Sequence, residues 1–181
     1  MSIRRAALWS LASQYASFAI QFATSVIVSR FYLLPADVGL FSIALAAAMM
    51  FAIFQDMGIS RFVTGQPDMK PDAVRDYAAV AVVVGWLVAL VVALSAVPLA
   101  RFYHQPGLAP LLWIVAAGYA IAPFATVPAA LLTRAMNFRA LFLTNAGSAA
   151  IGGITAIACA ARGLGPASLA WGTLAIAASR L

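Results

Sequence analysis

The sequence predicts an all-α membrane protein, a bundle of about six transmembrane helices that forms a single membrane domain over residues 1–181. The composition is the first observation, because 65% of the residues are hydrophobic and only 9% are charged. Soluble domains carry about 25% charged residues, so a soluble enzyme, a disordered chain and a disulfide-linked secreted domain are excluded. The second observation is that long uncharged runs separate the charges, as expected of helices that cross a bilayer core of ~30 Å with ~20 residues each.

Six uncharged runs define the expected spans in chain order. They are 24, 18, 24, 32, 22 and 17 residues long. Backbone groups in lipid must hydrogen-bond within their own segment, so each run is expected to be a helix. A membrane barrel would instead show alternating segments of ~10 residues, and these runs do not alternate. The expected spans are residues 7–29, 38–54, 77–100, 110–133, 140–161 and 166–179.

One long loop is expected, at residues 55–76 between the second and third spans. Pro67 and Pro71 break the helix there, because proline lacks an N–H and restricts the residue before it. Asp72 is then placed to cap the start of the third helix.

The basic residues predict the orientation, because cytoplasmic loops are enriched in Lys and Arg. With six spans the loops alternate between two sides, and eight basic residues fall on the side of the N-terminus against three on the other. The N-terminus is therefore expected in the cytoplasm. Because the arginines are spread over the loops rather than clustered, no nucleic-acid partner is expected. The eight are Arg4, Arg5, Arg61, Lys70, Arg75, Arg134, Arg139 and Arg180, and the three are Arg30, Arg101 and Arg162.

Polar residues recur on one face of the first span, since residues three, four and seven apart share a helix face. Gln14, Ser17 and Gln21 follow this spacing. Two glutamines near mid-membrane are costly when they face lipid, so the stripe is expected to face other helices or water. Two interpretations stay open, close packing between helices and a hydrated passage for a polar solute. The passage is favoured for this span.

The remaining spans carry different signals. The fifth and sixth are rich in small residues such as Gly152 and Gly172, which favours close packing between helices. Pro123 and Pro128 are expected to kink the fourth span. The third span is almost uniformly apolar and is expected to be the most lipid-exposed.

Ionisable and amide residues in or near the spans are candidates for a transport pathway, because the membrane interior penalises them. Arg30 lies about 180° around the helix from the glutamines, so it is also interpretable as an interface anchor. The single cysteine and single histidine cannot form a disulfide or a zinc site, and no catalytic set, metal or cofactor site is expected. The chain is therefore not expected to be an enzyme. The candidate pathway residues are Gln14, Ser17, Gln21, Arg30, Asp56, Arg61, Arg134 and Asn145.

Several short motifs keep a familiar order along nearly the whole chain. They are VSRFYLLPADVG at 28–39, FQDMGIS at 54–60, FYHQPGLAPL at 102–111, LTRAMNFR at 132–139 and GLGPASLAWG at 163–172. In this order and spacing the chain resembles the polysaccharide-transporter family of lipid-linked oligosaccharide flippases, which belongs to the multidrug/oligosaccharidyl-lipid/polysaccharide superfamily. The positions that match the family pattern are Arg30, Asp37, Asp56, Gly58, Arg134 and Phe138.

The resemblance implies a multi-pass protein of the bacterial inner membrane, built as two lobes of bundled helices. Such proteins move undecaprenyl-pyrophosphate-linked sugars, for O-antigen, lipopolysaccharide or exopolysaccharide synthesis, from the cytoplasmic to the periplasmic leaflet. The implied partners are the lipid-linked oligosaccharide and membrane lipid. The resemblance also implies that cationic residues between the lobes meet the pyrophosphate.

The length departs from this pattern, because six helices make one lobe. The chain is therefore expected to be the N-terminal lobe of a longer transporter, whose partner is a missing C-terminal lobe or a second copy, since alternating access needs two bundles. Two rivals stay open. A multidrug-exporter lobe would need carboxylates within the membrane, whereas all five Asp lie at interfaces or in loops. A small assembly protein would bind a partner through its small-residue faces.

Overall fold

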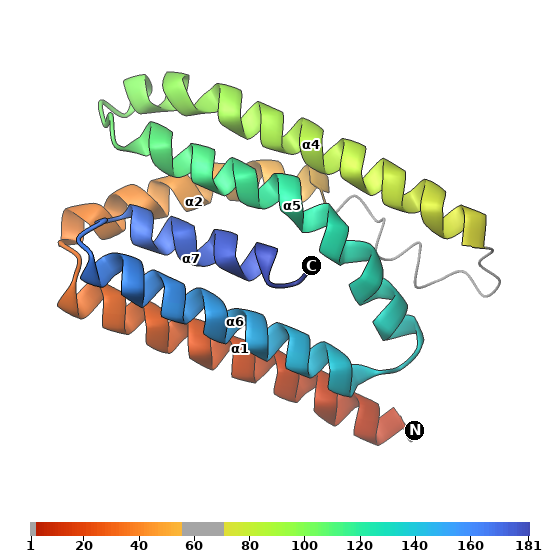
Figure 1. The fold of residues 1–181 in the computed structure, drawn as a ribbon. Coiled ribbons are helices and arrows are strands. Elements are labelled where there is room, and N and C mark those ends of the chain that lie inside the picture. Colours follow the sequence, from red (N-terminus) through yellow and green to blue (C-terminus); the bar gives the residue numbers. More distant parts are fainter. Residues whose placement is uncertain (1–2, 56–70) are drawn as a thin grey trace.

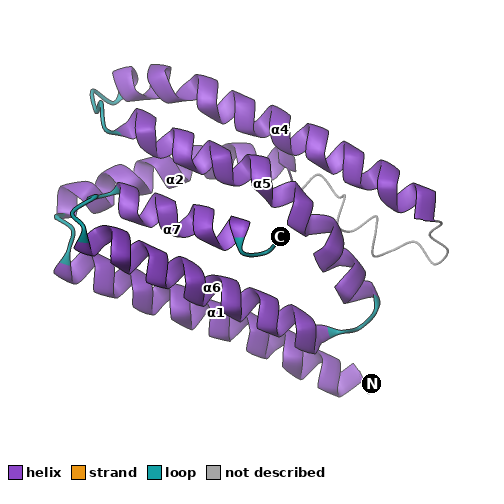
Figure 2. Cartoon of the chain, viewed as in Figure 1, coloured by secondary structure: helices purple, strands orange, loops and turns teal. Residues whose placement is uncertain are grey.

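The computed structural model describes residues 3–55 and 71–181, and the candidate residues Asp56 and Arg61 lie outside these ranges. The described residues form helices joined by short turns, with no strand among them (Figures 1 and 2). The all-α fold class is confirmed, and each expected span coincides with a helix. The helices are α1 (Ile3–Phe31), α2 (Pro35–Gln55), α4 (Pro71–Phe102), α5 (Leu108–Arg134), α6 (Phe138–Ala161) and α7 (Ala167–Ala178).

Four of these helices are long and apolar enough to cross a membrane, among the residues that the structure describes. The shorter apolar helices are Pro35–Met50 of α2 and the whole of α7. A helix of the 12 residues of α7 rises only ~18 Å, against a hydrocarbon core of ~30 Å. The C-terminal end of α7 lies between α5 and α6 (Figure 1). The four long spans are Leu8–Phe31, Ala78–Phe102, Leu108–Arg134 and Phe138–Ala161.

Local sequence signals set the helix ends. Asp37 in the first turn of α2 accepts a hydrogen bond from the backbone N–H of Leu34 (3.1 Å), which satisfies a donor just before the helix. Asn137 caps α6 by accepting from the backbone N–H of Ala140 (3.3 Å). The predicted start of the third span is wrong, because α4 begins at Pro71 and Asp72 lies within its first turn rather than at the cap. Proline is well suited to the first helical position, where its missing N–H needs no partner.

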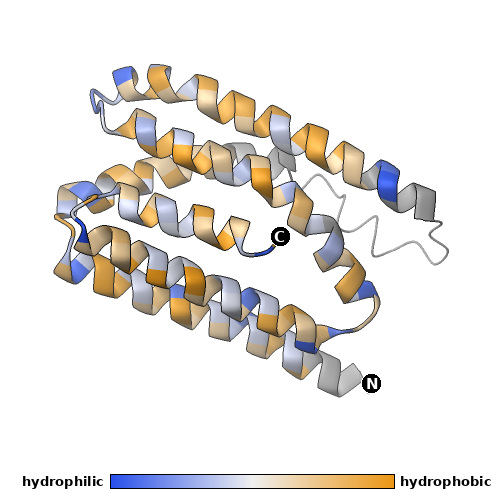
Figure 3. Cartoon of the chain, viewed as in Figure 1, coloured by the Kyte–Doolittle hydropathy of each residue, from blue (hydrophilic) through white to orange (hydrophobic). Residues whose placement is uncertain are grey.

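The helices pack as two groups that α5 and α7 join. In one group α4 and α5 run antiparallel and pack with α2 around a core that includes Val92, Leu108 and Leu112. The Tyr119 hydroxyl of α5 ties this group together by donating to the carbonyl of Ala48 on α2 (3.2 Å). In the other group α6 runs alongside α1, and α7 lies between α5 and α6 (Figure 1). Apolar residues cover the helices along their lengths, while hydrophilic ones gather near the ends and turns (Figure 3).

Of the four long spans, α1 has the smallest buried share, which corrects the expectation for the third span. Only 11% of the residues in its most apolar window are buried, against 33% in that of α4. The reason is packing, because α4 lies against both α5 and α2 whereas α1 packs mainly against α6. An apolar sequence therefore did not identify the helix with the most exposed surface.

Candidate functional site

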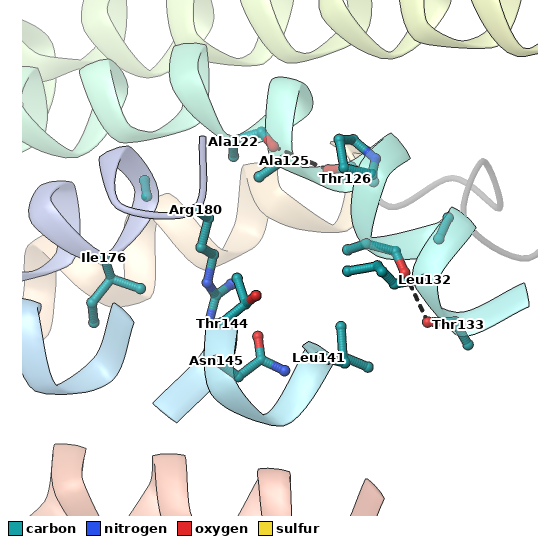
Figure 4. Close-up of a pocket in the computed structure, with 14 residues that line it drawn as sticks. Ala122, Ala125, Thr126, Leu132, Thr133, Leu141, Thr144, Asn145, Ile176 and Arg180 are labelled. Atoms are coloured by element: carbon teal, nitrogen blue, oxygen red, sulfur yellow. Dashed lines mark hydrogen bonds between the residues drawn. The ribbon is translucent and has the colours of Figure 1, made fainter. Parts of the chain in front are cut away.

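A cavity of about 810 Å³ lies between the second half of α5, the first half of α6 and the end of α7. Its walls are mostly alanine and leucine, but five polar side chains reach it from the three segments (Figure 4). The five are Thr126, Thr133, Thr144, Asn145 and Arg180.

Two prolines explain why this space is open. Pro123 and Pro128 lie inside α5, where each removes a backbone donor and disturbs the preceding turn. From this region onward α5 turns away from α4 and towards the start of α6 (Figure 1). The expected kink of this span is therefore present, and it separates the second half of α5 from the end of α7.

The threonine hydroxyls that line the cavity already donate hydrogen bonds to carbonyls of their own helices. Thr126, Thr133 and Thr144 donate to the carbonyls four residues earlier, at 3.1, 2.9 and 3.0 Å. A hydroxyl oxygen keeps acceptor capacity after it has donated. These side chains can therefore accept hydrogen bonds from a hydroxylated ligand or from water.

Asn145 is held in place by α1. Its Nδ2 donates to the hydroxyl of Ser13 (3.1 Å), and Ser13 is buried between the helices. The amide oxygen of Asn145 points towards the cavity (Figure 4). The hydrogen bond to Ser13 thus orients a polar group at the edge of the cavity.

Arg180 is the functional candidate that sequence reasoning missed. Its side chain enters the cavity and extends towards Thr144 and Asn145 (Figure 4). The orientation count had grouped Arg180 with the basic residues on the side of the N-terminus. The signal was present in the sequence, since a run of 17 uncharged residues before Arg180 is short for a full span of ~20.

A second, smaller cavity of about 270 Å³ lies between α1, α2, α6 and α7. Gln21, Thr24, Ser25 and Thr173 supply its polar groups. Ile176 of α7 lines both this cavity and the larger one. The two polar spaces therefore meet at one aliphatic side chain.

The polar stripe of the first span divides between the two interpretations. Ser17 faces the helix interface, where its hydroxyl is buried without a hydrogen-bond partner among the described residues. Thr24 lies so close to α6 that a Cβ on Gly153 would come within 2.5 Å of its hydroxyl oxygen. Gln14 and Gln21 are exposed, and Gln21 lines the smaller cavity. Ser17 and Thr24 thus contribute to the packing between α1 and α6, whereas the two glutamines are exposed.

The other candidate residues are not brought together. Arg30 is exposed at the end of α1, beside the turn into α2, and Arg134 is exposed at the end of α5, which lies at the opposite end of the bundle (Figure 1). Of the candidates in the described ranges, Asn145 lines the larger cavity and Gln21 the smaller one.

Small residues bring α6 and α7 into close contact, as predicted. A Cβ on Gly172 would lie 2.8 Å from the Cβ of Ala156 and 3.0 Å from the carbonyl oxygen of Gly152. A Cβ on Gly152 would meet the side chain of Ile176. These glycines therefore fix the position of α7 against α6, and with it the wall between the two cavities.

A comparison with protein families adds a result that geometry alone does not supply. A family profile described as "Polysaccharide biosynthesis protein" matches residues 7–181. Neither the curated proteins nor the solved structures compared with the chain match it. Since the family match covers almost the whole sequence, the chain belongs to a family of membrane proteins that take part in polysaccharide biosynthesis.

Proposed function

We propose that this chain is the N-terminal lobe of an inner-membrane flippase that moves lipid-linked oligosaccharide for polysaccharide biosynthesis. In this proposal undecaprenyl-pyrophosphate sugars cross from the cytoplasmic to the periplasmic leaflet by alternating access, with no covalent step. The observation that carries it is the polar cavity in an apolar bundle, where Arg180 and Asn145 face three threonines.

The chemistry of the cavity suits the polar end of such a lipid. A guanidinium offers several N–H donors to phosphate oxygens and keeps its charge at any physiological pH. The threonine oxygens accept from sugar hydroxyls, while the isoprenoid chain stays in the surrounding lipid. Arg180 lines the cavity with an exposed side chain, so its guanidinium is accessible to a ligand there.

The position of the cavity agrees with loading from the cytoplasm. Its lining residues Leu132, Thr133 and Leu141 lie next to the turn between α5 and α6, at the same end of the bundle as the N-terminus (Figure 1). The basic residues favour a cytoplasmic location for this end. We expect alternating access to require a second bundle, contributed by another lobe or by a second copy of this chain.

Two observations weigh against the rival functions. Proton- or cation-coupled drug export would need a carboxylate in a cavity, but none lines either polar cavity among the residues that the structure describes. An assembly protein would present its small-residue faces to a partner, but Gly152 and Gly172 face each other within this chain.

A binding measurement tests the proposal with the full chain in lipid nanodiscs. Undecaprenyl pyrophosphate and the uncharged undecaprenol are compared by native mass spectrometry. We expect the pyrophosphate to bind at least about tenfold more tightly, because one charge-assisted contact contributes about 1.5–3 kcal/mol. Arg180→Gln should abolish this preference and Arg180→Lys should keep part of it, while Arg162→Gln, an exposed arginine in the turn before α7, should leave it unchanged. Equal binding of the two lipids, or an unaffected Arg180→Gln protein, would contradict the proposal.

A further inference from the structure

An apolar groove runs along the α4–α5 pair, and it shares no lining residue with the polar cavities. Its volume is about 660 Å³, and Trp86 and Trp113 form its walls. The Trp113 indole is fixed, because its Nε1 donates to the carbonyl of Ala93 (3.3 Å). The floor consists of the small residues Ala89, Ala93, Ala116, Ala117 and Ala120.

A stripe of exposed side chains connects this groove to a cation at one end of α4. Its members are spaced by three and four residues, so they share one face of the helix. The aliphatic members are all exposed, and the last member is an exposed arginine. The stripe consists of Val83, Leu87, Leu90, Leu94, Val97 and Arg101.

The neighbours of Arg101 place it at the membrane interface. Phe102 and Tyr103 form an edge-to-face pair with ring centroids 5.3 Å apart, and both rings are exposed. Aromatic residues of this kind gather at the headgroup level of bilayers. Arg101 has no hydrogen bond or ion pair from its side chain to any residue within 3–55 or 71–181. Its charge is thus available to an anion at headgroup depth.

We propose that the Trp113 end of the groove, with the exposed stripe that leads from it to Arg101, seats one acyl chain of an anionic phospholipid whose phosphate pairs with Arg101. The lengths agree, because Trp113 is level with Ala93, which precedes Arg101 by ~12 Å along the helix axis. A chain from one leaflet extends ~15 Å, half the hydrocarbon core, so it passes Trp113 and ends near Leu90. Trp86 precedes Arg101 by ~22 Å along the axis and lies beyond its reach.

Charge complementarity selects a lipid rather than another helix as the occupant. At headgroup depth an anionic lipid supplies both the chain for the apolar groove and the phosphate for the exposed guanidinium, whereas an apolar helix surface supplies no counter-charge. One basic residue near an anionic membrane surface contributes an attraction that corresponds to about a fivefold preference for the anionic lipid. This binding site does not depend on the proposed transport function.

Quenching of tryptophan fluorescence by brominated lipids tests the proposal. Trp9→Phe and Trp171→Phe remove the other two tryptophans, and phenylalanine preserves an aromatic contact of residue 9 with Phe142 (centroids 5.5 Å apart). A further Trp86→Phe or Trp113→Phe change then leaves a single reporter. Each full-length protein is placed in phosphatidylcholine vesicles that contain chain-brominated phosphatidylglycerol or chain-brominated phosphatidylcholine at the same fraction.

The expected result is specific to one tryptophan. The Trp113 reporter should reach half-maximal quenching at about fivefold less brominated phosphatidylglycerol than brominated phosphatidylcholine. Arg101→Gln should remove this difference and Arg101→Lys should keep it, whereas Arg30→Gln, an exposed arginine at the same end of the bundle, should not alter it. Circular dichroism checks that each variant retains its helices.

Three results would overturn the proposal. Equal quenching by the two lipids would show that Arg101 selects no anion. The same preference at the Trp86 reporter would place the bound chain at the wrong depth. No quenching of Trp113 by either lipid would mean that protein, such as a second copy of the chain, covers the groove.

Discussion

The contact between α6 and α7 depends on Gly172, because any side chain at this position would force the two helices apart. In the Gly172→Ala protein the new Cβ would lie 2.8 Å from the Cβ of Ala156 and 3.0 Å from the carbonyl oxygen of Gly152. Non-bonded carbon atoms prefer separations of ~3.5–4.0 Å, so the helices must move apart by roughly 0.5–1 Å. The Gly152 oxygen belongs to the backbone of α6 and cannot rotate away.

The net cost follows from two opposing terms. Overpacking of a tight interface destabilises a protein by about 1–3 kcal/mol. Replacing glycine by alanine inside a helix returns up to about 1 kcal/mol of helix propensity. We therefore expect Gly172→Ala to lower the free energy of unfolding by about 1 kcal/mol, the central cost of about 2 kcal/mol less the gain of about 1 kcal/mol.

Unfolding by sodium dodecyl sulfate in mixed micelles, followed by far-ultraviolet circular dichroism, measures this difference. The matched control is Gly147→Ala in α6, where a Cβ would meet nothing within 4 Å. The control should be as stable as the unchanged protein or more stable, because only the propensity term applies. If Gly172→Ala is not destabilised, or if Gly147→Ala loses as much stability, the close contact between α6 and α7 is not what positions α7.

Two further predictions concern the α1–α6 pair and the orientation. A double-mutant cycle of Ser13→Ala and Asn145→Ala, measured by the same unfolding assay, should give a coupling energy of about 0.6–2 kcal/mol for their hydrogen bond, and additive effects would exclude the bond. In a Cys159→Ala background, a cysteine at Asn137 should react with an impermeant maleimide only from the cytoplasm and one at His104 only from the periplasm. Labelling in the reverse order would invert the proposed orientation.

The helices could be predicted from the sequence because charges are expensive in lipid. A charge therefore marks the edge of a span, and the short turns here follow Phe31, Phe102, Arg134 and Ala161, all within one residue of an arginine. The same rule takes every charge to be at an interface, so it does not indicate that Arg180 lines a cavity. A guanidinium in a polar cavity lies among polar side chains instead of at an interface. Only the three-dimensional placement of α5 and α6 reveals that cavity.

Burial and close contacts were less predictable, because they depend on which helices become neighbours. The uniform apolar surface of α4 indicated exposure, yet α1 has fewer buried residues. Periodicity placed Ser17 and Gln21 on one face, but a helix face is broad enough to meet α6 on one side and a cavity on the other. The predicted start of α4 was wrong because the effect of proline depends on its position. Proline interrupts a helix when it lies in the interior, but it is favourable at the first helical position, where Pro71 lies.

Packing and passage, the two interpretations of the small and polar residues, are linked in this bundle. Gly152 and Gly172 let α7 approach α6, and this approach brings Ile176 against Gly152, between the two cavities. A bulkier residue at position 152 would displace Ile176 and so alter the wall that separates Arg180 from Gln21. The residues that hold the helices together therefore also determine whether the two polar spaces stay separate.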